Sequence, residues 1–274
     1  MTTFRALAKE WIPPIVVHSI RRWRGRNIRF EGDFATWGEA AARCTGYSTK
    51  EILAKVLAAT LKVKHGETAF ERDSVPFDEI QHAWPVLAGL MWAAARNGGR
   101  LDVLDFGGAL GSSYFQTRAF WQALPEVRWS VVEQPHYVEA GHAHIQDERL
   151  RFYRTNAECL RENQPNVILL SSVLQYLASP AAVLAELATT GADCLIIDRT
   201  PFLKAGEDKI MIQRVPPSIY CASYPMRVFS EQKILNILGA HWHLVASNLS
   251  PEGFGESTEG VKFSFQGMLF ERRQ

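Results

Sequence analysis

The sequence has no apolar run long enough to cross a membrane. Its longest uncharged apolar stretch, residues 83–95, is shorter than the roughly 20 residues that a spanning helix needs. The basic N-terminal segment is interrupted by Pro13-Pro14 and is not followed by a small-residue cleavage site, which argues against a signal peptide. These absences predict a cytoplasmic protein.

Cysteine is scarce and the net charge is small. The 274 residues include four cysteines, none of them in a C-x-x-C pair, which predicts reduced, mostly buried thiols and neither a disulfide framework nor a zinc site. We therefore expect no metal. A formal net charge of +1 argues against bulk binding to nucleic acid. With 47% hydrophobic and 22% charged residues, the composition is that of an ordinary globular protein.

The small net charge hides an uneven distribution. Residues 1–30 carry seven basic side chains and one acid, so the rest of the chain is net acidic. A basic arm that also contains Trp11 and Trp23 is typical of peripheral contact with the anionic inner face of a membrane. A solvated arm, or a contact in an oligomer, explains the same pattern, and these interpretations stay open.

Residues 31–100 are predicted to form an all-helical cap. The segments T-W-G-E at 36–39 and S-T-K-E at 48–51 both have the spacing of a capping box, which satisfies free amides at a helix start. A third helix is expected to begin near Asp78, with Pro85 marking a kink or a later start. Between the helices, residues 66–74 carry the charged run Glu71-Arg72-Asp73, which lines a cofactor or substrate mouth or forms a solvated ion-pair cluster.

The dinucleotide fingerprint G-x-G-x-x-G is absent as well. Instead, the apolar run 101–106 leads into D-F-G-G-A-L-G, with Asp105 two residues before Gly107. A strand, a glycine turn and a helix bring backbone amides close to a nucleotide-like ligand. A carboxylate here would repel a pyrophosphate but suits the ammonium of a methionine moiety. The turn resembles motif I of class I S-adenosylmethionine (SAM) methyltransferases, with Ala109 at the usual middle glycine.

Polar residues mark the carboxyl ends of the strands that follow. Glu133 ends the second strand, where a carboxylate accepts from both hydroxyls of a ribose. Asn156, after the third strand, lies beside an adenine edge or is a turn residue. The fourth strand, 166–177, carries polar residues near its end that would face methionine. The predicted cofactor-binding residues are Asp105, Phe106, Gly107, Gly108, Ala109, Gly111, Glu133, Gln134, Asn156, Ser171, Ser172 and Gln175.

The order of elements predicts an α/β fold of the Rossmann-like class I methyltransferase type. We expect a mostly parallel seven-stranded sheet with one antiparallel strand, because two further strands, 241–249 and 261–270, follow five strand–helix repeats without a long helix between them. Residues 203–229 are expected to be a long irregular connection, typical of lids or binding loops. The predicted division is a basic arm (1–30), the helical cap (31–100) and a SAM-binding domain (101–274).

Four runs of sequence resemble one family more closely. They are G-E-T-A-F-E-R-D-S-V, L-D-V-L-D-F-G-G-A-L-G-S-S-Y-F-Q, V-E-Q-P-H and I-L-L-S-S-V-L-Q-Y-L, and they look like a family of class I methyltransferases found in bacterial gene clusters for O-antigen-type surface polysaccharides. The similarity runs from about residue 30 to the C-terminus. It implies SAM as cofactor and a glycan or glycan-precursor acceptor.

The hypothesis for function is methyl transfer from SAM to an oxygen of a sugar-containing acceptor. The protein mainly has to align donor and acceptor, and a general base near the strand ends would assist a hydroxyl. Asp198, Tyr176 and His136 are the candidates, and Asp198 is the first choice. Two alternatives stay open: a nicotinamide-dependent oxidoreductase and a non-catalytic SAM-fold scaffold in a glycan-assembly complex.

Overall fold

The computed structural model describes residues 28–45, 50–72, 75–216 and 222–273. The predicted basic arm lies almost entirely outside these residues, and so does the capping box expected at Ser48. Within the described ranges, no helix is long and apolar enough to span a bilayer.

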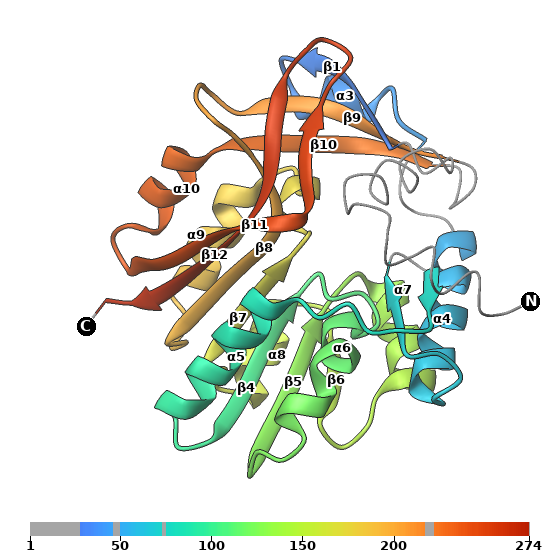
Figure 1. Ribbon diagram of the computed structural model, residues 1–274, viewed down its shortest axis with the longest axis vertical. Helices are drawn as coiled ribbons and strands as arrows, with labels where there is room; N and C mark the ends of the chain where they lie inside the picture. Colours follow the sequence, from blue (N-terminus) through green and yellow to red (C-terminus); the bar gives the residue numbers. More distant parts are fainter. Residues whose placement is uncertain (1–27, 46–49, 73–74, 217–221, 274) are drawn as a thin grey trace, which may run out of the picture.

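The centre of the molecule is a parallel sheet (Figure 1). Its strands lie in the order β6-β5-β4-β7-β8, and β12 adds antiparallel to β8, with β11 antiparallel to β12 beyond it. These seven strands, with one of them antiparallel to its neighbours, confirm the predicted class I methyltransferase fold. Their bounds are β4 Arg100–Phe106, β5 Glu126–Val132, β6 Leu150–Tyr153, β7 Val167–Ser171, β8 Cys194–Leu203, β11 Trp242–Glu256 and β12 Lys262–Arg272.

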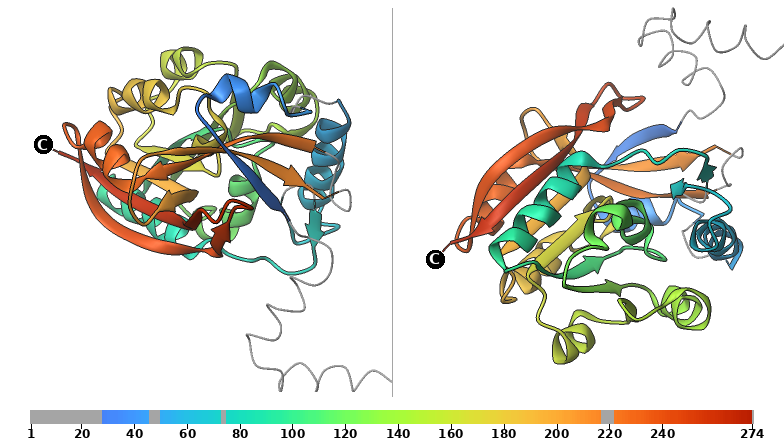
Figure 2. Two further views of the ribbon diagram at one scale, coloured as in Figure 1. Left: turned by 90° about the horizontal axis from the view of Figure 1, so that it is seen from above. Right: turned by 60° about the horizontal axis from the view of Figure 1, so that its bottom comes forward.

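Helices cover both faces of this sheet (Figure 2). Alternate residues of β4 belong to different cores: Val103 packs in a core with α5 and α6, and Leu104 in a core with α8, α9 and α10. Burial on both faces explains why the strands are almost continuously apolar. The helices are α5 Trp84–Arg96, α6 Ser112–Trp121, α7 Pro135–Ala140 with the π-helical turn η1 Gly141–Ile145, α8 Asn156–Glu162, α9 Pro180–Ala188 and α10 Glu231–Leu238.

A second, three-stranded antiparallel layer lies beyond the carboxyl ends of the central strands, at the top of Figure 1. It consists of β1 (Arg29–Phe34), β9 (Lys209–Val215) and β10 (Ala222–Ser230), and the end of β10 pairs in parallel with the end of β8. The expectation of an irregular connection over 203–229 is therefore wrong. The pairing of β9 with β1 brings together segments from opposite ends of the chain, which local sequence patterns do not reveal.

The cap region is not all-helical, contrary to the prediction. It contains β1 and the hairpin of β2 (Phe70–Arg72) and β3 (Val75–Phe77), besides α3 (Trp37–Ala41) and α4 (Lys50–Lys64). The capping box at Thr36 is confirmed, because its hydroxyl accepts from the Glu39 amide at 3.2 Å. The third helix begins at Trp84 with Pro85 in its first turn, which is the later start that proline favours. The division into domains stays a prediction.

Two further boundaries differ from the expectation. The fourth strand ends at Ser171, and the short 3-10 turn η2 (Leu174–Tyr176) follows it. The strand expected at 241–249 is longer, because β11 continues to Glu256. In β11 and β12 the pairing of long strands overrides the local preference of glycine and proline for turns.

Candidate active site

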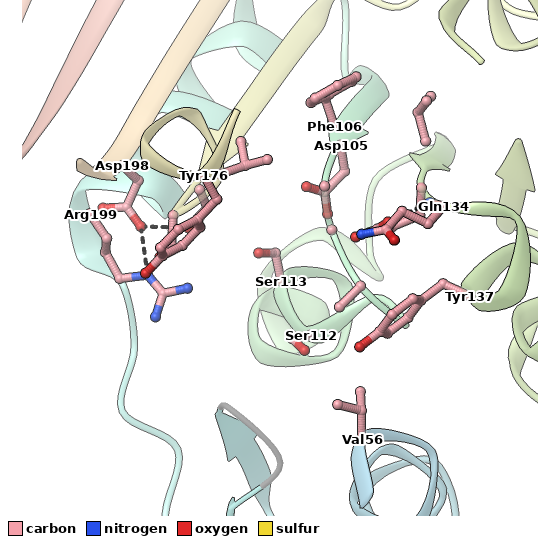
Figure 3. A pocket seen from close by; sticks show the side chains of 18 of the residues that line it. Val56, Asp105, Phe106, Ser112, Ser113, Gln134, Tyr137, Tyr176, Asp198 and Arg199 are labelled. Atoms are coloured by element: carbon pink, nitrogen blue, oxygen red, sulfur yellow. Dashed lines mark hydrogen bonds and ion pairs between the residues drawn. The ribbon is translucent and has the colours of Figure 1, made fainter. Parts of the chain in front are cut away.

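A cavity of about 620 Å³ opens at the carboxyl ends of the central strands (Figure 3). Its walls include the ends of β4, β5, β7 and β8, together with residues of α3, α4, β2 and β10. Ligand pockets usually measure roughly 300–1,000 Å³, and ligands of open α/β sheets bind outside the carboxyl ends of the strands. The cavity therefore has the size and the place of a ligand site.

The glycine turn after β4 forms one wall. A Cβ on Gly107 would lie 2.3 Å from the Val173 side chain, and one on Gly108 would lie 2.5 Å from the Asp105 carboxylate. Gly107 also has a φ of 73°, a conformation that favours glycine. Both positions are closed to any larger residue, so the backbone itself lines the cavity at this point.

Asp105 is buried beside this turn, with 1% of its surface exposed. Its Oδ2 accepts a hydrogen bond from the Trp129 indole at 2.9 Å. Burial raises the pKa of Asp105 to about 7; the Trp129 hydrogen bond and Arg199 oppose this, whereas the negative charge of Glu133 adds to it. A cation bound beside this carboxylate would remove the cost of ionising it.

Glu133 lies at the end of β5 and also lines the cavity. Its Oε2 accepts from the backbone amide of Gln134, and burial raises its pKa. Neither Glu133 nor Asp105 forms an ion pair within the part of the chain that the structure describes. The cofactor side of the cavity therefore holds two carboxylates that have no ion-pair partner among the described residues.

The opposite wall comes from β7 and β8. Asp198 is 5% exposed, and its Oδ2 accepts from the Ser171 hydroxyl at 2.8 Å and lies 3.6 Å from the Arg199 guanidinium. Figure 3 shows Asp198, Arg199 and Tyr176 across the cavity from Asp105 and Gln134. The two aspartates thus face the same space from different strands.

Left-handed backbone conformations gather at this cavity. Among the described non-glycine residues, those with positive φ are Ala109 (50°), Ser172 (56°) and Arg199 (49°), and all of them line the cavity. Such conformations cost of order 1–3 kcal/mol each and cluster at functional sites. Three strained residues, two of them after β4 and β7 and one within β8, therefore lie at the same cavity.

Gln175 supports two of these turns and does not line the cavity. It is fully buried, and its Nε2 donates to the Ser172 hydroxyl at 3.1 Å and to the Arg199 carbonyl at 3.2 Å. In the structure its side chain therefore holds the ends of β7 and β8 together. Gln175 therefore does not reach the cavity, where it was predicted to contact the cofactor.

A hydrogen-bonded chain of side chains joins η2 to the second layer. The Tyr176 hydroxyl donates to Gln213 Oε1 at 3.1 Å, and Gln213 Nε2 donates to the Tyr224 hydroxyl at 3.2 Å. Both tyrosines line the cavity, and their rings meet edge to face at 5.0 Å. β10 thus contributes Tyr224 to the cavity, and Gln213 of β9 bonds to both tyrosines.

The charged run near residue 71 also reaches the cavity. Glu71 is 3% exposed and accepts from the Ser112 hydroxyl at the start of α6, and both Glu71 and Arg72 line the cavity. Their place at the cavity agrees with the interpretation of this run as part of a ligand mouth, which stays a prediction. Asp73 lies outside the described residues.

Four predicted site residues do not line the cavity. Gly111 is the left-handed N-cap of α6, with a φ of 90°. His136 lies in the first turn of α7 with its ring centroid 4.9 Å from that of Tyr137. Asn156 is buried at the start of α8, and its Oδ1 has no hydrogen-bond partner within the described ranges. The fourth is Gln175, and the other predicted residues all line the cavity.

Sequence reasoning missed several lining residues. Trp37, Val56 and Tyr224 come from elements outside the strand–turn–helix repeats, and Tyr137 comes from α7 within them. Val56 belongs to the apolar face of α4 and is typical of core residues, so it carried no signal. Tyr224 was visible only as an aromatic residue in the long segment predicted to be functional.

No family model matches the sequence, and no curated protein matches it. The solved structures that it resembles include three methyltransferases. The 1,6-didemethyltoxoflavin-N1-methyltransferase of Burkholderia thailandensis, with bound S-adenosylhomocysteine, is 17% identical with a TM-score of 0.42, and the match covers 92% of this chain and 97% of that one.

The other two are more distant in sequence. The N-methyltransferase NodS of Bradyrhizobium japonicum is 12% identical with a TM-score of 0.43, over 82% of this chain and 98% of that one. The amino pentose methyltransferase CalS10 of Micromonospora echinaspora is 12% identical with a TM-score of 0.40, over 69% and 92%. Identities at this level carry neither a substrate nor a reaction over to this chain, whose activity has to be argued from its own cavity.

Proposed function

We propose that this chain is a SAM-dependent methyltransferase. The observation that carries the proposal is the pair of cavity-lining carboxylates, Asp105 and Glu133, beside a turn closed to any residue larger than glycine at Gly107 and Gly108. The ammonium and the sulfonium of SAM are the positive charges that such a wall favours. A pyrophosphate would meet these carboxylates with like charge, which argues against the nicotinamide alternative.

The residues fit SAM along the strand ends. The Asp105 carboxylate would hold the methionine ammonium, and Glu133 would accept from the ribose hydroxyls. Asn156, predicted to lie beside the adenine, does not line the cavity, so we assign it no contact with the cofactor. Ser171 and Ser172 line the cavity between the two aspartates, where the methionine end would lie. When bound, SAM supplies an electrophilic methyl group.

Asp198 is the proposed general base. Ser171 and Arg199 both contact its Oδ2, and its Oδ1 makes no hydrogen bond within the described part of the chain. An acceptor hydroxyl beside Oδ1 would be held for in-line attack and would lose its proton to the carboxylate. Tyr176 lines the same side, and its hydroxyl, which donates to Gln213, would orient the acceptor.

We further propose a sugar-containing acceptor of surface polysaccharide synthesis, with methyl transfer to oxygen. Support comes from the sequence resemblance and from the acceptor side of the cavity, where Trp37, Tyr176 and Tyr224 offer aromatic surface and hydroxyl groups. Peripheral membrane contact through residues 1–30, and an oligomer, stay predictions, since the arm lies almost entirely outside the described residues.

The test is transfer of labelled methyl from SAM to a mixture of sugar nucleotides and lipid-linked glycans. We expect label in a glycan fraction with the wild-type chain and at least a tenfold loss with Asp198→Asn, a loss typical of general-base removal. The control is Asp33→Asn, because Asp33 is an exposed carboxylate paired with Lys209 outside the cavity. Tight SAM binding without any transfer would favour the scaffold alternative.

A further inference from the structure

A tryptophan of the second layer reaches the cavity. Among the tryptophans of the described ranges, Trp37 alone lines it. Trp121, Trp129 and Trp242 are fully buried, and Trp84 is exposed outside the cavity. Part of the Trp37 side chain packs against a small core made by α3 and β9. The rest of the indole is therefore an apolar, planar surface that a ligand in the cavity meets.

Two features fix the position of Trp37. It is the first residue of α3, whose start is set by the capping box of Thr36 and Glu39. The Arg227 guanidinium lies over the indole, 5.7 Å from the ring centroid, in a cation–π contact. Arg227 does not line the cavity, so the part of the indole that the cavity reaches is not the face that the guanidinium covers.

Arg227 is itself held on the side away from the cavity. Its side chain is 14% exposed, lies 3.6 Å from the Asp208 carboxylate and donates to the Ala178 carbonyl at 3.4 Å. The Asp208 carboxylate, 8% exposed, accepts from Lys233 and from the Ser230 amide, both at 2.9 Å. The guanidinium behind the indole is thus part of a connected network. Such preorganisation is what a residue that orients a substrate needs.

Trp37 belongs to the side of the cavity that holds the proposed base. α3 packs against β10, and Figure 1 shows it in the second layer. Tyr224 of β10 also lines the cavity, and its ring meets that of Tyr176 edge to face at 5.0 Å. Tyr176 lies beside Asp198 in Figure 3. The indole is therefore on the wall where the acceptor, and not the cofactor, would lie.

A fixed indole suits one kind of ligand surface. The C–H bonds on one face of a pyranose ring form an apolar patch, while the hydroxyls at its rim stay available for hydrogen bonds. An open-chain polyol has no such face. Tryptophan combines a large apolar contact area with a rigid plane, which is why it is enriched where binding energy is concentrated.

We propose that Trp37 stacks against the C–H face of a pyranose ring of the acceptor, and that Arg227 positions the indole from the side away from the cavity. This inference rests on the proposed methyltransferase function. It names the residue that selects a ring-form sugar at the same site.

The experiment measures sugar binding to the protein saturated with S-adenosylhomocysteine, by saturation-transfer-difference NMR. The pyranose probes are glucose, galactose, mannose and N-acetylglucosamine. The open-chain control is glucitol, which carries hydroxyls like those of glucose on a chain without a ring face. We expect at least one pyranose to bind saturably and about tenfold more tightly than glucitol, because only a ring buries an apolar face against the indole.

Two substitutions of Trp37 separate stacking from simple packing. Trp37→Leu keeps an apolar side chain without a planar face and should weaken pyranose binding about tenfold. Trp37→Phe keeps a smaller planar face and should weaken it only about threefold. Affinity for S-adenosylhomocysteine should stay within about twofold in both, which also shows that the variants fold. The matched control is Trp84→Leu, because Trp84 is 60% exposed and does not line the cavity; it should leave pyranose binding unchanged.

The positioning role of Arg227 has a test of its own. Arg227→Met removes the cation and keeps an unbranched side chain, and it should weaken pyranose binding about threefold. Arg227→Lys restores a cation and should recover most of this loss. Equal losses in the two variants would overturn the positioning role.

The stacking itself would be overturned by any of four results. They are glucitol binding as tight as that of every pyranose, no saturable binding of any pyranose to a protein that binds S-adenosylhomocysteine, pyranose affinity unchanged in Trp37→Leu, and tighter Trp37-dependent binding of phenol than of every pyranose. Failure of the wild type to bind S-adenosylhomocysteine would count against the proposed function instead. The pyranoses are then titrated against the unliganded protein, where the effect of Trp37→Leu still decides.

Discussion

β4 and β8 each carry a buried aspartate at the same cavity, but the two carboxylates have different surroundings. Asp105 accepts from a neutral indole, and its pKa is raised to about 7. Asp198 accepts from the Ser171 hydroxyl and has the Arg199 guanidinium beside it. Asp198 thus has a cation beside it within the protein. Asp105 has no cation as a direct partner among the described residues.

The residues that follow the two aspartates differ in the same way. After Asp105 come Gly107 and Gly108, where any Cβ would clash. After Asp198 comes Arg199, a charged residue in a left-handed conformation that Gln175 holds. The comparison indicates that the β4 end is built for a ligand to approach the backbone, and the β8 end for side chains to act on a ligand.

The largest expected effect concerns the β4 turn. In Gly108→Ala the added Cβ would lie 2.5 Å from the Asp105 carboxylate and would clash with it. Because overpacking of a closely packed site is destabilising, we expect the affinity for S-adenosylhomocysteine to fall by more than tenfold. Calorimetric titration measures this affinity. Gly191→Ala is the control, because a Cβ there has nothing within 4 Å. Equal affinities in the two variants would contradict the role given to this turn.

The next prediction concerns a substitution that removes the charge of Asp105 and keeps the shape of its side chain. Asp105→Asn should weaken S-adenosylhomocysteine binding about tenfold to a hundredfold, the range for loss of a hydrogen bond to a charged group. Unchanged affinity would remove the electrostatic account of the cofactor side. Asp198→Asn, measured in the same titration, should change this affinity little, because Asp198 lies on the acceptor side.

The pH dependence distinguishes the two aspartates further. The pKa of Asp105 is raised in the unliganded fold to about 7, and a bound ammonium favours its ionised form, so affinity should fall as pH drops below about 7, by up to about tenfold per unit. Because a raised pKa disfavours the ionised form in the fold, Asp105 also costs the unliganded protein stability as pH rises from about 4 towards 7. Asp105→Asn should abolish both trends in calorimetry and thermal unfolding. A flat affinity profile in the wild type would contradict this reading.

The smallest effect concerns the link to the second layer. Tyr176→Phe removes the hydroxyl that donates to Gln213, so the buried amide oxygen of Gln213 loses this hydrogen bond. We expect the free energy of unfolding, measured with urea, to fall by about 1–3 kcal/mol. Affinity for S-adenosylhomocysteine should stay within twofold, because Tyr176 lies on the acceptor side. A large loss of that affinity would show that the two sides are not separate.

Much of the cofactor side was predictable because its signals are local. The acid before the glycine turn and the acid ending β5 each stand next to the strand that positions them, and parallel strands bring their carboxyl ends to one edge. His136 and Asn156 follow the same strand ends but do not line the cavity. Being near a strand end places a residue at the right edge of the sheet without fixing the direction of its side chain.

The acceptor side was not predictable in the same way, because its contacts join distant segments. Arg214 of β9 forms an ion pair with Glu31 of β1, 183 residues away in the sequence. Arg72 and Glu252 meet from β2 and β11. Neither pair has a recurring spacing that a sequence pattern would reveal, and both depend on how β1 and the β2–β3 hairpin pack.

The strand–helix repeats from β4 to β8 and the acid-and-glycine turn could be predicted from the sequence alone, since hydrophobic period and glycine conformation act over a few residues. Tertiary contacts were needed to show which charges share the cavity, that β10 adds to its wall, and that Gln175 bonds to Ser172 and Arg199 from behind. The physical reason is that burial and charge compensation depend on neighbours in space, and this chain takes those neighbours from both of its ends.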